Sequence, residues 1–282
     1  MAFTLAELTV MSNDIYTGIT EQSKLPFLAS TRWSTEAAGA TSVVITSVGD
    51  ITFNDIVNGT PATTQSPTPT QATLSIDHHK DFWVPAYDTQ RLIPGFVQQT
   101  AQKAAAAAAL LPDALVLSMA TKANFSANWI AGSSDAAISF SSSTSLAQLD
   151  TINEVLAGQN VPEDQRFVCL PPKLYTRVLQ GIRAAGIPAQ ESTDAMFQGR
   201  AIKVCGLNII QSNQYAVVTG SGTYDYRVLF GHTDAIACAY LPVQTKQQDI
   251  NLGWGVNIGG KVEYGAKVIN AKFGGAAYFV AA

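Results

Sequence analysis

Charged residues are scarce in this chain. Asp, Glu, Lys and Arg make up 13% of its 282 residues, about half of the share that is typical of a soluble domain, whereas the hydrophobic share of 47% is ordinary. Such a chain either solvates itself with hydroxyl groups, as a Ser/Thr-rich secreted protein does, or covers much of its surface with partners. We favour the second explanation, which predicts an oligomer.

Basic runs are also missing. No two Lys or Arg residues are adjacent anywhere in the sequence, and the formal net charge is -4. A dedicated nucleic-acid-binding protein would carry a basic patch or stripe that contacts phosphates. The composition therefore argues against that class of protein.

The three cysteines, Cys169, Cys205 and Cys238, lie far apart and form no CxxC motif. This pattern predicts small buried hydrophobes in a reducing compartment, not disulfides or zinc ligands. The first residues lack the basic and apolar regions of a signal peptide, and no apolar run approaches the roughly 18 residues of a membrane span. We expect a soluble protein that is made in the cytoplasm.

Residue patterns that support catalysis or ligand binding are weak. The adjacent residues His78 and His79 would point to opposite faces of a strand, so they cannot share a metal ion, and His232 has no ligand-like neighbour. Asp77 and Asp81 resemble paired carboxylates but fit a solvated hairpin base better. The sequence has no nucleophile elbow, phosphate-binding loop or dinucleotide fingerprint. We assign no catalytic, cofactor-binding or metal-binding residue and expect no enzyme activity.

The N-terminal third favours extended structure. Gly18 to Trp33 is expected to form an extended arm, and Thr41 to Val57 shows β alternation around a Gly-Asp turn signal. The Pro/Thr-rich segment Asn58 to Gln71 has no large apolar residue and cannot form a central strand. Because Leu74 to Tyr87 alternates again, we predict a long two-stranded hairpin whose tip is Asn58 to Gln71.

An alanine-rich helix is predicted next. Pro94 suits a first helical turn, and Phe96 to Leu110 contains six consecutive alanines, the best helix formers. Pro112 should end or kink this helix. A second helical piece is expected from Asp113 through Met119.

The remaining elements mix helices and strands. Thr144 or Ser145 is expected to cap an amphipathic helix that ends at Gly158 as its C-cap glycine. The further expected elements are a short strand in the Ser-rich loop (137–140), a buried strand (166–170), a short helix (173–179), a strand pair (202–210) and strands at 217–218, 226–230, 235–240 and 264–269. This order predicts the α+β class.

The order of these elements resembles the tailed-bacteriophage major capsid (coat) protein family, which has the Hong Kong ninety-seven type fold. The resemblance rests on Leu74–Asp88, the Ala-rich helix Gln98–Met119 with Asp113, the segment Leu149–Leu179 with Asn160, Pro162, Asp164, Arg166, Pro171 and Tyr175, the segment Gly199–Asn213 with Gly206, and the closing strands Gly231–Ala239 and Tyr264–Val268. The departures are Pro112 in the helix and the Pro/Thr-rich tip.

The resemblance implies five parts along the chain. They are an N-terminal arm (1–38), an extended β-hairpin loop (39–87), a peripheral domain with a spine helix (88–130), an axial domain (131–235) and return strands of the peripheral domain (236–282).

It also implies a function. Copies of the chain would form pentamers and hexamers that close an icosahedral shell around the double-stranded DNA genome, which they contact non-specifically. Portal and possibly decoration proteins would be further partners, and assembly would take place in the bacterial host cytoplasm. The alternatives are an encapsulin-like nanocompartment shell, a hydrolase of unfamiliar pattern, and a phage tail or adhesion protein.

A separate scaffolding protein is expected as well. Some members of this family carry a long, charged, helical N-terminal extension that serves as a scaffold. Here about 38 residues precede the first β segment, and they show neither heptads nor charge blocks.

We predict that the mature shell is held together without covalent cross-links. In the cross-linking members of the family, a lysine on the extended loop attacks an asparagine of a neighbouring subunit, and this chemistry needs an amine. No lysine lies between Lys24 and Lys80, and Lys80 lies near the hairpin base. Particles boiled in detergent should run as one band near 29.9 kDa. A ladder that survives reducing agent would contradict this, and Lys80 would then be the residue to mutate.

Overall fold

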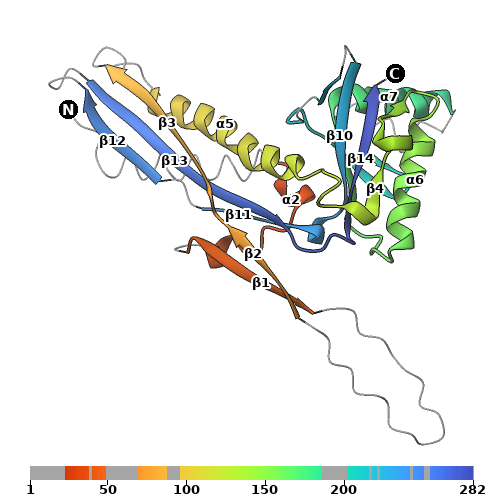
Figure 1. Cartoon of the computed structure of the whole chain (residues 1–282). Coiled ribbons are helices and arrows are strands. Elements are labelled where there is room, and N and C mark those ends of the chain that lie inside the picture. The colour runs from red at the N-terminus through yellow and green to blue at the C-terminus, as the bar shows by residue number, and fades with distance from the viewer. Residues whose placement is uncertain are drawn as a thin grey trace, which may run out of the picture.

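The computed structural model describes most of the chain. The described residues are 23–37, 40–48, 69–87, 96–185, 202–215, 218–220, 223–241, 244–250 and 255–281. They form three parts, which are a long body of strands with one long helix, a compact body of mixed sheet and helices, and a projecting two-stranded hairpin (Figure 1).

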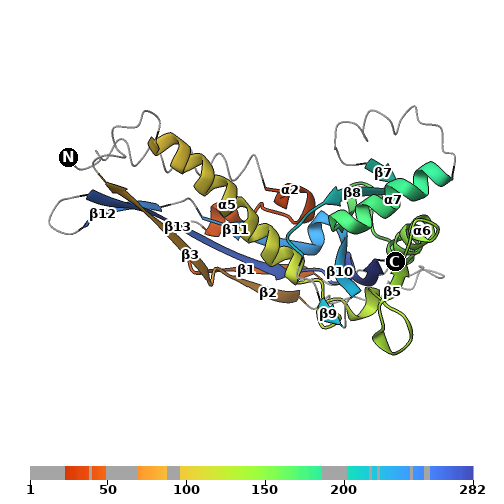
Figure 2. The ribbon, with the colours of Figure 1, turned by 90° about the horizontal axis from the view of Figure 1, so that it is seen from above.

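The long body is built around strand β13 (Gly255–Val268). On one side β13 pairs antiparallel with β3 (His78–Tyr87). On its other side it pairs with β12 (Gln244–Ile250) and then with β11 (Ile236–Tyr240). Helix α5 (Phe96–Ser118) runs along this sheet, and its buried alanines let the helix approach closely (Figures 1 and 2).

Helix α5 continues through Pro112, so of the two expected effects of this proline, an end or a kink, the end is wrong. A proline inside a helix removes one backbone hydrogen bond and costs about 3 kcal/mol. The flanking turns are held by tertiary packing, because Ala108 and Ala109 before the proline and Val116 and Leu117 after it are buried. Within the described ranges, no helix is both long and apolar enough to cross a membrane.

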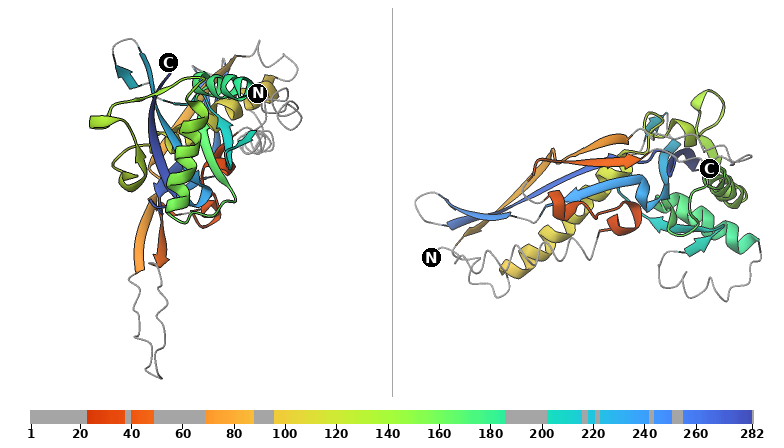
Figure 3. Two further views of the ribbon diagram at one scale, coloured as in Figure 1. Left: turned by 90° about the vertical axis from the view of Figure 1, so that its right-hand side faces the viewer. Right: turned by 90° about the horizontal axis from the view of Figure 1, so that it is seen from below.

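The predicted hairpin is confirmed for β1 (Ser42–Val48) and β2 (Pro69–Ser75), which pair antiparallel from Ser42 opposite Ser75 to Val48 opposite Pro69. One face of the hairpin is buried. Its side chains Val43, Ile45, Leu74 and Ile76 pack against Trp33, Ala37, Ala237 and Ala239. Figure 3 shows from a second direction that the hairpin projects away from both bodies.

The chain leaves the hairpin earlier than expected. Residues 78–87 were assigned to the hairpin, but as β3 they pair with β13 of the long body. Pro69 lies at the end of β2, where its missing N–H is tolerated because each strand of a two-stranded sheet is an edge. The expected strand positions at 51–57 and residues 58–68 of the expected tip lie outside the described residues. Residues 69–71, which were expected in the tip as well, pair with β1 as the start of β2, so that part of the prediction is wrong.

The compact body contains an eight-stranded sheet. Its strands, in spatial order, are β4 (Trp129–Ile130), β14 (Gly274–Ala281), β10 (Thr223–His232), β6 (Arg166–Leu170), β8 (Leu207–Gln211) and β7 (Ile202–Val204), with β5 (Ile138–Phe140) beside β14 and β9 (Val218–Gly220) beside β10. Strand β14 pairs with β10 from Gly274 to Val280, so residues 274–281 belong to this sheet. These residues were expected among the return strands 236–282, but in this structure they pair with β10 and not with β13.

Two helices, α6 (Ser145–Gly158) and α7 (Pro172–Ala184), pack on this sheet. The expected apolar stripe of α6 is confirmed by the burial of Leu149, Ile152 and Leu156. The expected C-cap glycine is wrong, because Gly158 is still helical and Asn160 takes the left-handed conformation with φ 55°. The Val161 N–H then donates to the Leu156 carbonyl (3.1 Å), which closes the end of the helix.

The N-terminal segment is less extended than expected. Short helices α2 (Leu25–Leu28) and α3 (Ser34–Ala37) form instead, since burial of Leu25 and Leu28 stabilises the first of them. Between them Ser30 forms a bridge to Ala237 of β11. Three 3-10 turns complete the described elements: η1 (Ser126–Asn128), η2 (Ser133–Asp135) and η3 (Thr233–Ala235). Residues 1–22, including the short stripe at Leu5, Leu8 and Met11, lie outside the described residues.

A buried arginine organises the link between α6 and β6. Arg166 is 5% exposed. Its Nε donates to the Pro162 carbonyl (3.0 Å), its Nη1 to Asn153 Oδ1 (2.6 Å) and its Nη2 to the Val161 carbonyl.

We predict that Arg166→Ala lowers the free energy of unfolding by about 3 kcal/mol, because it leaves several buried acceptors without donors. Urea denaturation of the subunit measures this loss. Arg227→Ala on the exposed side of β10 is the control and should change stability by less than about 0.5 kcal/mol. If the two substitutions lowered the free energy of unfolding equally, the hydrogen bonds of Arg166 would not be stabilising the subunit as predicted.

Candidate assembly surfaces

The histidines are placed apart from one another. His78 pairs with Tyr264 and His79 with Glu263 across the β3–β13 register, so their side chains point to opposite faces, as the sequence predicted. His79 Nδ1 lies 3.1 Å from Glu263 Oε1, and the buried His232 Nδ1 accepts from the Asp234 N–H (3.1 Å). In the part of the chain that the structure describes, no cluster of three or more His, Cys, Asp or Glu could hold a metal ion.

The cysteines are free thiols. Cys169 and Cys238 are buried, as expected, and burial raises the pKa of the Cys169 thiol to about 12 and that of Cys238 further still. Cys205 differs, because it is only partly buried, in the tight turn between β7 and β8 with φ 50°. Burial and the neighbouring Asp150 raise the pKa of its thiol to about 12, so none of the three is an activated thiolate.

The carboxylates near the hairpin base do not act as a pair. Asp77 Oδ1 lies 2.6 Å from His78 Nδ1, whereas Asp81 Oδ2 accepts from the Trp83 indole N–H (3.1 Å). Both acids are exposed, as the solvated-base interpretation expected. Their contacts orient neighbouring rings and offer no acid–base couple.

Among the residues that the structure describes, large apolar side chains are exposed at four places. They are Phe27 on α2 (59%), Val44 on β1 (57%), Trp83 on β3 (46%) and Leu110 on α5 (43%). Aromatic and apolar residues that a monomer leaves in solvent are typical anchors of protein–protein contacts. Val44 follows from the strand alternation, because its neighbours Val43 and Ile45 face the core.

Trp83 is held in a defined position. A Cβ at Gly259 would lie only 2.6 Å from its ring carbon Cε3, so the indole lies against the bare backbone of β13. The hydrogen bond from the indole N–H to Asp81 also holds the ring in place. Trp83 is therefore a rigid, half-exposed aromatic surface on the face of β3 that points away from α5.

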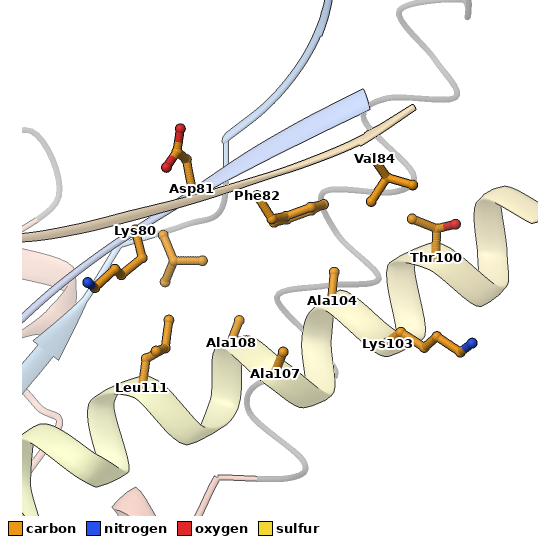
Figure 4. A pocket seen from close by; sticks show the side chains of 11 residues that line it. Lys80, Asp81, Phe82, Val84, Thr100, Lys103, Ala104, Ala107, Ala108 and Leu111 are labelled. Atoms are coloured by element: carbon orange, nitrogen blue, oxygen red, sulfur yellow. The ribbon is translucent and has the colours of Figure 1, made fainter. Parts of the chain in front are cut away.

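The opposite face of β3 borders an apolar groove (Figure 4). Phe82 and Val84 line it from the sheet, and Ala104 and Ala108 line it from α5, where the small alanines leave space. The groove has a volume of about 590 Å³, and Lys80 and Lys103 lie at its rim. Four exposed apolar residues and this groove make the long body and hairpin a surface suited to contacts with other chains.

Asp113 ties the N-terminal segment to α5. Its carboxylate is buried and accepts hydrogen bonds from Ser23 Oγ (2.6 Å) and from the Lys24 N–H (2.9 Å). Burial raises the pKa of this carboxyl, although the two hydrogen bonds oppose the shift. This role of Asp113 is not among the predictions from the sequence. Its burial could have been predicted from the sequence, because Asp113 follows Ala105 and Ala109 at the four-residue spacing of one helix face, and both alanines are buried.

The family model and three of the solved structures that match this chain are of phage or phage capsid proteins. The family model described as phage capsid protein matches residues 85–278. A chain of Mycobacterium phage Che8 is similar with a TM-score of 0.67 at 17% identity, covering 91% of both chains. The capsid of cyanophage P-SCSP1u gives 0.64 at 17% identity, covering 87% of this chain and 85% of that chain, and the capsid of Ralstonia phage GP4 gives 0.63 at 14%, covering 90% and 87%. No curated protein sequence matches the chain.

The raised pKa of Asp113 predicts a pH dependence. A carboxyl whose pKa is raised on folding stabilises the fold fully below its ordinary value of 3.8, and this contribution is lost as the pH rises through the folded pKa. Asp113→Asn removes the titration. Its free energy of unfolding, relative to wild type, should therefore rise with pH from below that value towards neutrality, as measured by urea denaturation at several pH values.

Asp135→Asn is the matched control. The hydrogen bond from Lys122 lowers the pKa of the exposed Asp135, so wild type gains stability from this group as the pH rises. The relative stability of Asp135→Asn should therefore fall over the same pH range. Parallel curves for Asp113→Asn and wild type would contradict the role of Asp113.

Proposed function

The chain belongs to the phage capsid protein family, whose model matches well over half of it, and we infer that it is the major capsid protein that forms the phage shell. The fold agrees, since solved structures of tailed-phage capsids cover most of this chain and of their own. The protein is thus a structural protein of the virion capsid that assembles with itself. The family match carries this conclusion, and it disfavours the encapsulin-like alternative.

We propose that the parts of the fold correspond to the family's domains. The hairpin β1–β2 is the extended loop, the long body with α5 is the peripheral domain and its spine helix, and the compact body is the axial domain. Residues 1–38 form the arm. The boundaries expected from sequence shift in two places, because β3 joins the peripheral domain and β14 joins the axial domain.

Association is the mechanism. Copies form pentamers and hexamers that close an icosahedral shell around double-stranded DNA. The hairpin rests on an adjacent subunit, because an isolated two-stranded sheet is only marginally stable in water. The exposed Val44 on its outward face supports this contact, as does the rigid Trp83 on the peripheral sheet.

A structural role leaves no need for catalysis, and we propose that the protein is not an enzyme. The unreactive state of the three thiols agrees with this role. A separate scaffolding protein guides assembly in the host cytoplasm, a portal protein occupies one vertex, and decoration proteins are candidate partners on the finished shell. Contacts with the packaged DNA are non-specific, in keeping with the net charge of -4.

Electron microscopy of the purified protein tests this function. We expect closed polyhedral shells, with irregular sizes where no scaffolding protein is present. Val44→Asp should abolish them because it places a charge where the hairpin meets its neighbour, whereas Val44→Thr keeps the β-branched shape and should assemble. Since Val44 is 57% exposed, neither change should alter the urea midpoint of the subunit.

Two outcomes would contradict the proposal. A wild-type protein that sediments as a monomer at all concentrations and salt conditions would refute assembly. Shells of Val44→Asp formed as readily as those of wild type would refute the hairpin contact.

A further inference from the structure

Two neighbouring helices of the compact body carry charges of opposite sign. Helices α6 and α7 lie at the end of the molecule that is far from β12 (Figure 2). Each helix buries one side in the core of the compact body, for example Ile152 from α6 and Val178 from α7. The other side of each helix is left to solvent.

The charged residues of α6 are all acidic. They are Asp150 and Glu154, which are both exposed and lie one helical turn apart. We call their surface the acidic face. The exposed neighbours Ala147, Thr151 and Ala157 are small, so a partner can approach these carboxylates closely.

The charged residues of α7 are all basic. They are Lys173, Arg177 and Arg183, of which Arg183 is exposed and Arg177 is half-buried, with its Nη1 donating to Gln180 Oε1 (3.1 Å). We call this surface the basic face. Separation of sign between two helices is notable in a chain with only 13% charged residues.

Each face keeps a charged residue without an ion pair in the described subunit, although Asp150 lies beside Cys205 and Lys173 has an interaction of its own. Neither Glu154 nor Arg183 forms an ion pair with any residue that the structure describes. Each copy therefore offers an acidic surface and a basic surface on different elements. Two different surfaces of one chain that bind each other form a head-to-tail contact, which closes into a ring when the rotation permits.

We propose that the acidic face of α6 binds the basic face of α7 of the next copy around the capsomer ring. This inference rests on the proposed capsid function and names the contact that closes the pentamer and the hexamer. Opposite charges steer the encounter and fix its register, and contacts between two like faces are repelled. The same pairing serves rings of either size, because each copy uses both faces once.

Charge reversal tests the contact. One variant combines Asp150→Lys with Glu154→Lys, so both of its faces are basic. A second combines Arg177→Glu with Arg183→Glu, so both are acidic. At low salt each should form rings and shells at least about tenfold more slowly than wild type, and the chain carrying all four changes should recover. Native mass spectrometry counts the copies per ring, and electron microscopy detects shells.

An equal mixture of the two reversed variants gives a sharper result. Their faces match only when the variants alternate, which an even ring of six permits and an odd ring of five does not. We expect hexamers and open sheets or tubes without pentamers. Pentamers containing both variants would overturn the proposal.

Single reversals guard against misfolding. Glu154→Lys and Arg183→Glu change residues without a described ion pair, so their urea midpoints should match wild type, and together they should assemble better than either alone. Lys203→Glu on β7 changes the net charge as Arg183→Glu does and is the control, which should assemble normally. If Lys203→Glu impairs assembly as much as Arg183→Glu does, the helix contact is refuted while the capsid function stands. The same conclusion follows if both double variants with a reversed face assemble at the wild-type rate. If wild type forms no rings or shells, the capsid function itself fails.

Discussion

The arrangement of the hairpin and the long body depends on close packing against one strand, β13. It pairs with β3 on one side and with β12 and β11 on the other, so every other strand of this sheet is hydrogen-bonded to β13. At three of its glycines a side chain could not fit, and at one of them, Gly260, the ring of Phe82 occupies the space. The ring of Trp83 occupies the space beside Gly259, and the carbonyl of Ser75, the last residue of β2, occupies the space beside Gly265. The hairpin can cross β13 at this distance because the backbone there is bare.

This packing fixes directions as well as contacts. Only Ile76 and Asp77 separate β2 from β3, and Ile76 is buried under the hairpin, so the hairpin has little freedom to swing relative to the sheet at this junction. Val44 on the hairpin and Trp83 on the sheet therefore keep a set relation to each other. A subunit that builds a closed shell needs such defined angles, because small errors in each contact add up around a closed assembly.

Local residue patterns predicted the elements whose formation depends on residues close in the sequence. The apolar stripe of α6 and the strand β6, which is apolar from Phe167 to Leu170, follow from short-range patterns, and their burial bears this out. Pairing between distant segments has no local signal. The alternation in residues 78–87 shows that they form a strand, but it cannot tell whether the partner is β2 or β13. The predicted helix end at Pro112 was wrong for the same reason, because packing against other elements stabilises the helix on both sides of the proline. The assembly surfaces were the least predictable, because exposure of Trp83 depends on the partner strand.

Sparse charge has a physical use in a protein that contacts many copies of itself. Exposed charge gives solubility, but every ion left at an interface must be desolvated when copies meet. In the proposed contacts, apolar side chains such as Val44 and Trp83 would supply binding without this cost, although apolar contacts discriminate poorly between correct and incorrect neighbours. In the proposed ring, a few charges separated onto α6 and α7 add that discrimination. Screened surface charges bind weakly, so a misplaced subunit can leave, while the many contacts of a closed shell hold each correct subunit together.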